Sequence, residues 1–296
     1  MIWLDPDAVG LAQAAAAIRD GELVIMPTET VYGLAGSALN PAAVRAIFEA
    51  KGRPSTNPLI VHIAEVSDLD GLVDSVPAAA IPLIEKYWPG PLTLVFRKSS
   101  SVPDEITAGG PTVAIRMPAH PVARALIRIA GVPVAAPSAN RSMGLSPTRV
   151  EHLDPKLLEH VSVGLRSVPS LFGIESTVVD VTTEPPAVLR LGAISREALQ
   201  LGLANHAASA PQRSPGQDLR HYAPRTPIRI VGRLRPADRG LAVGELTPSE
   251  YAAQLYHQLF QLDQLGLEEI LIERVPFGAE WEAVRDRLAR ASVPES

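Results

Sequence analysis

The first 205 residues alternate between short apolar segments and longer segments with helical spacing, and this alternation limits the chain to few architectures. Segments rich in Val, Ile and Leu predict strands at residues 23–26, 59–63, 92–96, 112–117, 134–136, 177–181 and 188–191. Helices are expected between them at residues 5–18, 40–49, 78–87 and 121–130, the first capped by Asp5 and the second by Asn40. Such alternation is typical of an α/β or α+β fold, in which helices cover a sheet.

A proline-rich stretch separates this region from a second, smaller α/β pattern. Residues 206–227 lack apolar periodicity and carry several prolines, so we expect a linker there. The residues after it predict strands at 228–231 and 270–275 and helices at 248–265 and 280–291. A length of 296 residues also favours two domains, at roughly 150 residues each. We therefore predict a domain at residues 1–205, a linker at 206–227 and a small Rossmann-like α/β domain at 228–296.

Composition and charge exclude several classes of protein. Hydrophobic residues make up 46% and charged residues 20% of the chain, which indicates a folded globular protein. The net charge of −5 argues against a globally basic nucleic-acid binder. The absence of cysteine excludes disulfides, thiolate zinc sites and a cysteine nucleophile, and fits a cytoplasmic protein. We expect neither a membrane helix, which needs about 18 apolar residues, nor a signal peptide, because the chain begins with acidic Asp5 and Asp7.

Two polar segments stand directly after predicted regular elements. Residues 27–34 follow a strand and include Thr28, Glu29 and Thr30, which form either a polar turn or a ligand loop at the carboxyl end of the strand. Residues 51–58 follow a helix and begin with the cations Lys51 and Arg53. Such cations either complement the helix dipole or, held in a stiff proline-flanked loop, bind phosphate or carboxylate.

Further segments carry groups suited to anion binding. Arg116 ends an apolar strand and therefore needs an anionic partner, from the protein or from a ligand. Residues 136–140 and 146–148 are dense in hydroxyls and amides, which either cap turns or bind phosphate oxygens. The common nucleotide, metalloprotease and serine-hydrolase motifs are absent from the sequence. The seven histidines show no metal-ligand spacing, so we expect no metal-ligating residues.

Taken together, these segments resemble the YrdC-like threonylcarbamoyl-AMP synthase family over about residues 10–200. The residues that carry the resemblance are 27–34, Lys51-x-Arg53-Pro54 with Asn57-Pro58-Leu59, 88–93, 113–118, 136–140, 146–148, Glu175-Ser176-Thr177 and Leu189-Arg190. Residues 214–216 and 221–224 resemble the linker of the two-domain form, and the C-terminal unit resembles its accessory domain. The resemblance implies a twisted mixed sheet whose helices leave an open cleft.

The resemblance also implies a reaction. The family joins L-threonine, bicarbonate and ATP, with Mg²⁺, into threonylcarbamoyl-AMP and pyrophosphate, which makes it a nucleotidyltransferase. The product goes to the tRNA threonylcarbamoyl-transfer proteins that make threonylcarbamoyladenosine in tRNA. All three substrates are negatively charged, so the site has to be cationic and closed to water.

The family's residue roles can be carried to matching positions. Lys51 and Arg53 are the expected catalytic cations. The residues expected to bind threonine or its carbamate are Thr30, His62, Arg116, Ser138 and Ser176. The residues expected to bind ATP are Arg53, Asn57, Thr112, Asn140, Thr148, Arg190 and Tyr222, the last closing over the nucleotide from the linker.

The sequence leaves alternatives open, one of which is motivated by three departures from the family pattern. Met143 follows Ser142 where the family usually has glycine, residues 166–168 replace an Asp-Gly-Gly segment, and Leu191 replaces a proline. One alternative is therefore a regulatory paralogue without catalysis. Another is a module that binds double-stranded RNA, although the nearly balanced charge of residues 1–150 predicts only weak RNA binding. A carbamoyl-transfer maturation factor is disfavoured, because such proteins carry paired-cysteine zinc motifs and this chain has no cysteine.

Overall fold

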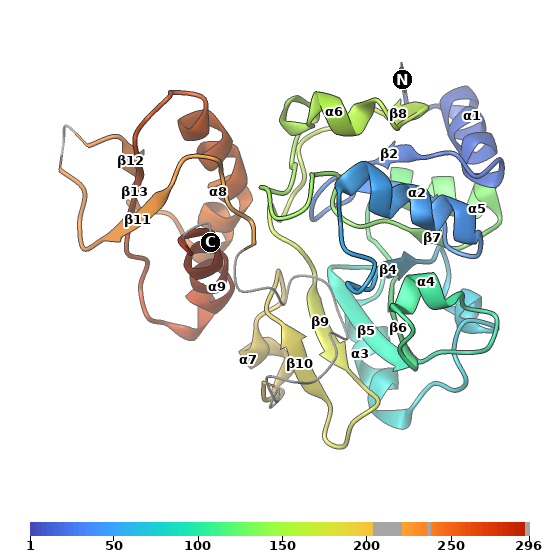
Figure 1. The fold of residues 1–296 in the computed structure, drawn as a ribbon. Coiled ribbons are helices and arrows are strands. Elements are labelled where there is room, and N and C mark those ends of the chain that lie inside the picture. Colours follow the sequence, from blue (N-terminus) through green and yellow to red (C-terminus); the bar gives the residue numbers. More distant parts are fainter. Residues whose placement is uncertain (204–220, 236–237, 294–296) are drawn as a thin grey trace.

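A large mixed sheet organises the N-terminal two thirds of the chain (Figure 1). We describe it in a computed structural model, which places residues 1–203, 221–235 and 238–293. Among these residues the sheet has ten strands, in the order β1 (Ile2–Leu4), β8 (Val163–Leu165), β2 (Val24–Met26), β3 (Gly33–Ser37), β7 (Val134–Ala135), β4 (Ile60–His62), β6 (Thr112–Arg116), β5 (Leu92–Arg97), β9 (Thr177–Asp180) and β10 (Ala187–Arg190). β4 pairs with β6 in parallel, whereas β5 pairs with β6 antiparallel. The predicted mixed sheet with covering helices is confirmed.

Helices cover the two faces of this sheet unequally. α1 (Ala8–Arg19) and α5 (Pro121–Ala130) pack against each other and against the face that holds Val24 and Met26. The other face, which holds Leu23 and Ile25, contacts α2 (Pro41–Lys51), α3 (Ile81–Tyr87), α4 (Asp104–Thr107) and α6 (Pro155–Leu158). The strand residues alternate between the two apolar clusters because successive side chains of a strand point to opposite faces.

Local signals in the sequence predicted most of these elements. Asn40 accepts hydrogen bonds from the backbone N–H groups of Ala42 and Ala43, which confirms it as the cap of α2. The predicted cap of the first helix was wrong: the helix begins at Ala8, and Asp7 rather than Asp5 accepts the Gly10 N–H, at 2.8 Å. Asp5 stands before Pro6, where the chain is biased to an extended conformation, so the helix starts later.

The sequence did not predict β3, which lies inside the segment 27–37. Its residues Gly-Leu-Ala-Gly-Ser lack the β-branched side chains that mark a strand. The small residues are required by close packing, because a Cβ at Gly36 would lie 3.1 Å from the Leu23 side chain. β1 and β8, at one edge of the sheet, were missed because three-residue strands carry little periodic signal.

A second, smaller unit follows at the C-terminal end. β11 (Ile228–Val231), β13 (Ile270–Glu273) and β12 (Gly240–Leu241) form a parallel sheet, flanked by α8 (Pro248–Asp263) and α9 (Glu282–Ala291). Figure 1 shows α8 and α9 on the side of this unit that faces the large sheet. The apolar cluster of the C-terminal unit includes Val31, Leu145 and Ile174 from the N-terminal region. The two units therefore share a buried apolar contact.

The predicted boundaries of the linker cannot be compared with the structure, because residues 204–220 lie outside the described part of the chain. The end of the predicted linker, from His221 onward, is described: the His221 N–H donates to the Arg290 carbonyl of the C-terminal unit and the Ala223 N–H to the Met143 carbonyl of the N-terminal unit. Within the described ranges, no helix is both long and apolar enough to cross a membrane.

Candidate active site

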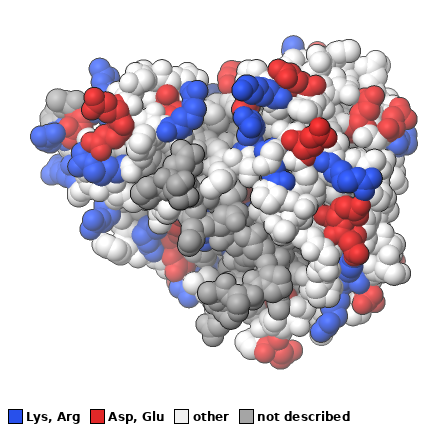
Figure 2. Space-filling model, in the orientation of Figure 1, with Lys and Arg blue, Asp and Glu red and all other residues white. Residues whose placement is uncertain are grey.

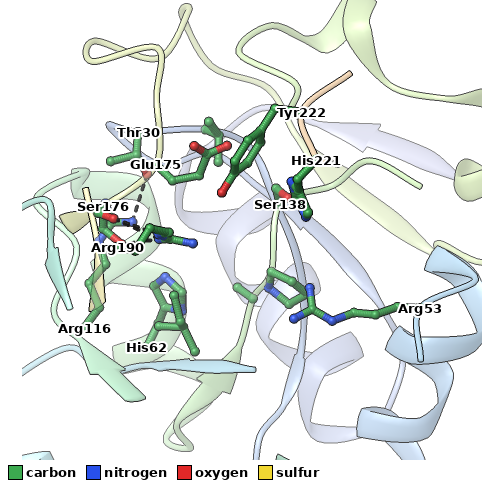
Figure 3. A pocket seen from close by; sticks show the side chains of 14 residues that line it. Thr30, Arg53, His62, Arg116, Ser138, Glu175, Ser176, Arg190, His221 and Tyr222 are labelled. Carbon is green, nitrogen blue, oxygen red and sulfur yellow. Dashed lines mark hydrogen bonds between the residues drawn. The ribbon is translucent and has the colours of Figure 1, made fainter. Parts of the chain in front are cut away.

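One part of the sheet surface forms the floor of a buried pocket. In β4 and β6, Val61 and Ile115 belong to the main apolar core, so the alternate residues His62 and Arg116 point to the opposite face. Ile60 lies on that face too and lines the pocket. Most of the predicted site residues come together here, as Figure 3 shows: Thr30, Arg53, His62, Arg116, Ser138, Ser176, Arg190 and Tyr222.

Arg116 is held by two neighbours in the segment that follows β2. Its Nη2 donates to Glu29 Oε1 at 2.5 Å, and its Nη1 donates to Thr30 Oγ1 at 2.8 Å. Both side chains of the ion pair are about 5% exposed. Burial alone raises the pKa of Glu29, but Arg116 and the Ala119 N–H outweigh it and hold that pKa below its usual value. The anionic partner that the sequence required for Arg116 is therefore supplied by the protein itself.

A second arginine is fixed on the same side of the pocket. Arg190 donates from Nη2 to the Ser176 hydroxyl at 3.0 Å and from Nε to the Ser176 carbonyl at 3.1 Å. The Ser176 hydroxyl lies 2.8 Å from that of Thr93 on β5. In Figure 3, Arg116, Arg190, Ser176 and His62 gather on one side of the pocket.

Arg53 lines the other side of the pocket, and Asn57 orients it. Arg53 Nη2 donates to Asn57 Oδ1 at 2.5 Å and to the Pro58 carbonyl at 2.8 Å. Asn57 itself is not among the lining residues. Arg53 and Asn57, which were both predicted to bind ATP, thus contact each other. Arg53 faces the pocket, and Asn57 fixes the plane of its guanidinium.

Lys51 lies behind the pocket wall. Its side chain is buried, and its Nζ donates to the carbonyls of Ser138 and Asn140, at 2.5 Å each. Burial, assisted by the charge of Arg53, holds the pKa of Lys51 well below its usual range. Lys51 is absent from the pocket lining and instead supports the loop that presents Ser138.

Besides Asn57, three more predicted ATP contacts are not among the residues that line this pocket. Thr112 begins β6, at the end of the strand opposite to Arg116. The Asn140 side chain donates to the carbonyls of Arg141 and Gly144, at 2.8 Å each. The Thr148 N–H donates to a ring nitrogen of His152 at 3.2 Å.

The sequence reasoning missed Glu175 and His221 as pocket residues. Glu175 stands beside Ser176 in a segment that the sequence had singled out, but its carboxylate was given no role. His221 precedes the predicted Tyr222, and both rings are buried. Each stands next to a residue that was predicted to be in the site, and this adjacency was the signal that could have identified them.

Tyr222 lines the pocket at its upper edge in the orientation of Figure 3, where its hydroxyl points toward the space between the two sides. Its backbone φ is +60°, a conformation that non-glycine residues adopt only when surrounding contacts stabilise it. The buried hydroxyl finds no hydrogen-bond partner among the described residues. A polar atom without a partner in such a place is suited to bind a ligand.

The departures from the family pattern lie outside the pocket lining. Met143 has a φ of +70°, which glycine adopts without strain, and its carbonyl accepts the Ala223 N–H at 3.0 Å. The Ser167 carbonyl accepts the Tyr32 hydroxyl at 3.0 Å. None of the three departures therefore removes a group from the pocket.

The buried histidines make stability depend on pH. Burial is the main cause that lowers the pKa of His62 to about 3, and the same holds for His221. In the unfolded chain a histidine titrates near about 6.5, so below that pH the unfolded state binds more protons. Each histidine therefore contributes stability that is complete above pH 6.5 and is lost as the pH falls toward 3.

We expect His62→Gln to reduce the pH dependence of the unfolding free energy by about 1.4 kcal/mol per pH unit between pH 6 and 4. Denaturant unfolding of the variant and of the parent protein at pH 6, 5 and 4 measures this slope. Replacing the exposed His160 by glutamine is the control. Parallel slopes for His62→Gln and the parent protein would show that His62 is not buried as a neutral side chain.

These features define a class of protein: a two-unit α/β protein with a pocket lined by three arginines, whose charge suits a small anionic ligand. A family model described as "Telomere recombination", for Sua5, YciO and YrdC proteins, matches residues 16–192. A second, described as "Threonylcarbamoyl-AMP synthase, C-terminal domain", matches residues 190–293.

Individual relatives agree with these matches. The chain is 38% identical to threonylcarbamoyl-AMP synthase of Bacillus subtilis, over 95% of this chain and 92% of the relative. It is 39% identical to the protein of that name from Pyrococcus abyssi, over 94% and 93%. The crystal structure of P. abyssi Sua5 complexed with L-threonine superposes with a TM-score of 0.88, covering 98% of this chain and 96% of that one at 36% identity. The chain therefore belongs to the threonylcarbamoyl-AMP synthase family, a family of enzymes.

Proposed function

We propose that this enzyme is a nucleotidyltransferase that makes L-threonylcarbamoyladenylate and pyrophosphate from L-threonine, bicarbonate and ATP, for threonylcarbamoyladenosine formation in tRNA. The observation that carries the proposal is the pocket itself. It brings Arg53, Arg116 and Arg190, whose side chains are largely buried, together with the hydroxyls of Ser138 and Ser176. The relatives' names and the threonine complex of P. abyssi Sua5 support the substrate assignment.

The proposed reaction has two bond-forming steps. The threonine amine attacks bicarbonate, and loss of one water gives the carbamate. A carbamate oxygen then attacks the α-phosphorus of ATP, and pyrophosphate leaves. Both steps bring anions together, so fixed cations contribute most by neutralising and orienting the reactants.

We assign threonine and its carbamate to the side of the pocket formed by Arg116, Thr30, Ser176 and His62. Arg116 is held by Glu29 and Thr30, so its guanidinium is already oriented before an anion binds. His62 is neutral at pH 7, and its Nδ1 has no partner among the described residues. It can therefore accept a hydrogen bond from the substrate without adding charge.

We assign ATP to Arg53 and Tyr222, with Ser138 and Arg190 where the two ligands meet, because Arg190 donates to Ser176 on the threonine side. Asn57 and Lys51 contribute indirectly, by fixing Arg53 and the Ser138 loop. Thr112 is too far along β6 to take part, at about 13 Å from Arg116 by strand geometry. Mg²⁺ enters as the MgATP substrate, and the hydroxyl oxygens of Thr30 and Ser138 are donors of the kind it accepts.

The proposal predicts that pyrophosphate release requires both threonine and bicarbonate. Serine lacks the methyl group of threonine, so we expect it to react about 10- to 200-fold less efficiently. A coupled pyrophosphate assay, with each substrate omitted in turn, measures both effects. Release that is indifferent to threonine would contradict the proposal.

The comparisons support the synthase and not the RNA-binding alternative. Figure 2 agrees, because acidic and basic side chains are interspersed over the described part of the face it shows. The regulatory alternative was motivated by the three departures from the family pattern. Because those residues lie outside the pocket lining, they no longer favour it. Use of the adenylate by tRNA threonylcarbamoyl-transfer proteins, and a cytoplasmic location, remain parts of the proposal.

A further inference from the structure

A buried arginine of the C-terminal unit reaches the proposed active site. Arg287 lies on α9, and its side chain is only 1% exposed. Arginine is almost never buried to this extent without a partner. One partner, Asp286, lies on its own helix, but the others are Glu175 and Leu191 of the N-terminal unit and the ring of Tyr222. Arg287 therefore joins the two units, as the ion pair between Arg196 and Glu282 also does.

The contacts of Arg287 involve two residues that line the pocket. Its Nε donates to Glu175 Oε2 at 2.8 Å, and its guanidinium carbon lies 4.6 Å from the centre of the Tyr222 ring. Its Nη2 donates to the Leu191 carbonyl at 2.8 Å. A planar guanidinium can stack on an aromatic ring and donate in its own plane at the same time, which an ammonium group cannot do.

Tyr256 on α8 completes the arrangement. Its hydroxyl lies 3.1 Å from each oxygen of Glu175, and its ring stacks near that of Tyr222 at 6.0 Å between centroids. The Ser146 hydroxyl donates to Glu175 Oε1 at 2.6 Å. The Glu175 carboxylate is thus held by neighbours on several elements, two of which belong to the C-terminal unit.

The same contacts fix the orientation of Tyr222. Its left-handed backbone conformation is unfavourable for tyrosine, and its ring is packed between Arg287, Tyr256 and His221. The direction of its hydroxyl therefore depends on groups that the C-terminal unit supplies.

We propose that Arg287 and Tyr256 are positioning residues, through which the C-terminal unit holds Glu175 and Tyr222 in place for the nucleotide. This inference rests on the proposed function, because it takes the ligand beneath Tyr222 to be ATP. Docking of the C-terminal unit and binding of ATP then favour each other by the same factor, since coupling between two sites is reciprocal.

The test compares Arg287→Met, Arg287→Lys and Tyr256→Phe with Arg285→Met as the matched control. Arg285 lies on the same helix, but it donates to the Pro276 and Gly278 carbonyls within the C-terminal unit. Each variant is first shown to be folded by circular dichroism and by a cooperative melting transition. Steady-state kinetics and calorimetry of threonine binding are then measured well below the melting temperature.

We expect Arg287→Met to reduce kcat/KM for ATP more than tenfold, while the Kd for threonine changes less than threefold. Arg287→Lys restores part of the loss, because it keeps the charge but not the planar fork. Tyr256→Phe has a smaller effect in the same direction, and Arg285→Met behaves like the parent protein. If Arg287 acts through the Tyr222 hydroxyl, adding Tyr222→Phe to Arg287→Met costs little more activity.

Two results would overturn the inference: an unchanged kcat/KM for ATP in folded Arg287→Met and Arg287→Lys, or independent, multiplicative effects of Arg287→Met and Tyr222→Phe. If Arg287→Met does not fold, Arg287→Lys and Tyr256→Phe decide. Failure of the proposed function is recognised separately, because the parent protein would then show no threonine-dependent synthesis. In that case the Kd for a non-hydrolysable ATP analogue, compared between the parent protein and Arg287→Lys, still tests the positioning role.

Discussion

Arg116→Met is expected to reduce threonine-dependent adenylate synthesis by about 1,000-fold, because it removes a fixed, buried cation from the pocket proposed to bind the anionic substrates. It is also expected to destabilise the fold by about 3–5 kcal/mol, because the buried Glu29 carboxylate loses its ion-pair partner. Denaturant unfolding and the pyrophosphate assay measure the two effects separately.

The variant Glu29→Gln/Arg116→Met separates the two roles. Removing both charges avoids the uncompensated carboxylate, so we expect most of the stability to return while activity stays low. Arg124→Met is the control, because Arg124 pairs with the half-exposed Glu65 and such pairs contribute about 0–1 kcal/mol. Recovery of synthesis in the double variant would show that Arg116 stabilises the fold without contacting the substrate.

Lys51→Met is expected to cost both stability and activity. The substitution leaves the carbonyls of Ser138 and Asn140 buried without their shared donor, at about 1–3 kcal/mol for each group left unsatisfied. We expect a loss of about 2–5 kcal/mol in the free energy of unfolding and at least a tenfold loss of kcat, because Ser138 is no longer held at the pocket.

Lys86→Met provides the comparison for Lys51. Lys86 also stands in the last turn of a helix, α3, but it is exposed and contacts the Tyr87 ring. Its loss should change stability by less than about 1 kcal/mol. Equal, small effects of the two substitutions would mean that Lys51 only complements the helix dipole.

The contrast between these two lysines shows what the sequence could predict. Position in a helix's last turn predicts a dipole interaction of about 0.3–1 kcal/mol for either residue. Only the fold shows that the Ser138 and Asn140 carbonyls converge on Lys51, some ninety residues away in the sequence. Long-range convergence of this kind leaves no local pattern.

The ion pair of Arg116 was more predictable, because its need for an anionic partner follows from the local sequence. A cation at the end of an apolar strand requires an anion, and Glu29 stood in a segment already marked as polar after a strand. The sequence left open whether that anion was protein or ligand. The choice depended on the segment after β2 reaching Arg116 on β6, although three strands separate β2 from β6 in the sheet. Such a contact is a property of the whole fold.

The burial of Arg287 could be predicted from the sequence, but its partner could not. In α9 the buried residues Val284, Leu288 and Ala291 follow helical spacing, and Arg287 falls on the same stripe. An arginine on an apolar stripe signals a buried charge. The identity of its partner, Glu175, required the packing of the two units against each other.

The central claim is that this pocket joins threonine, bicarbonate and ATP into one adenylate, and ¹³C-labelled bicarbonate tests it most directly. The enzyme is incubated with threonine, MgATP and labelled bicarbonate, and the products are analysed at once by mass spectrometry. We predict an adenylate that contains threonine and one labelled carbon, formed together with an equal amount of pyrophosphate. An unlabelled threonine adenylate, or pyrophosphate formed without any adenylate, would contradict the account.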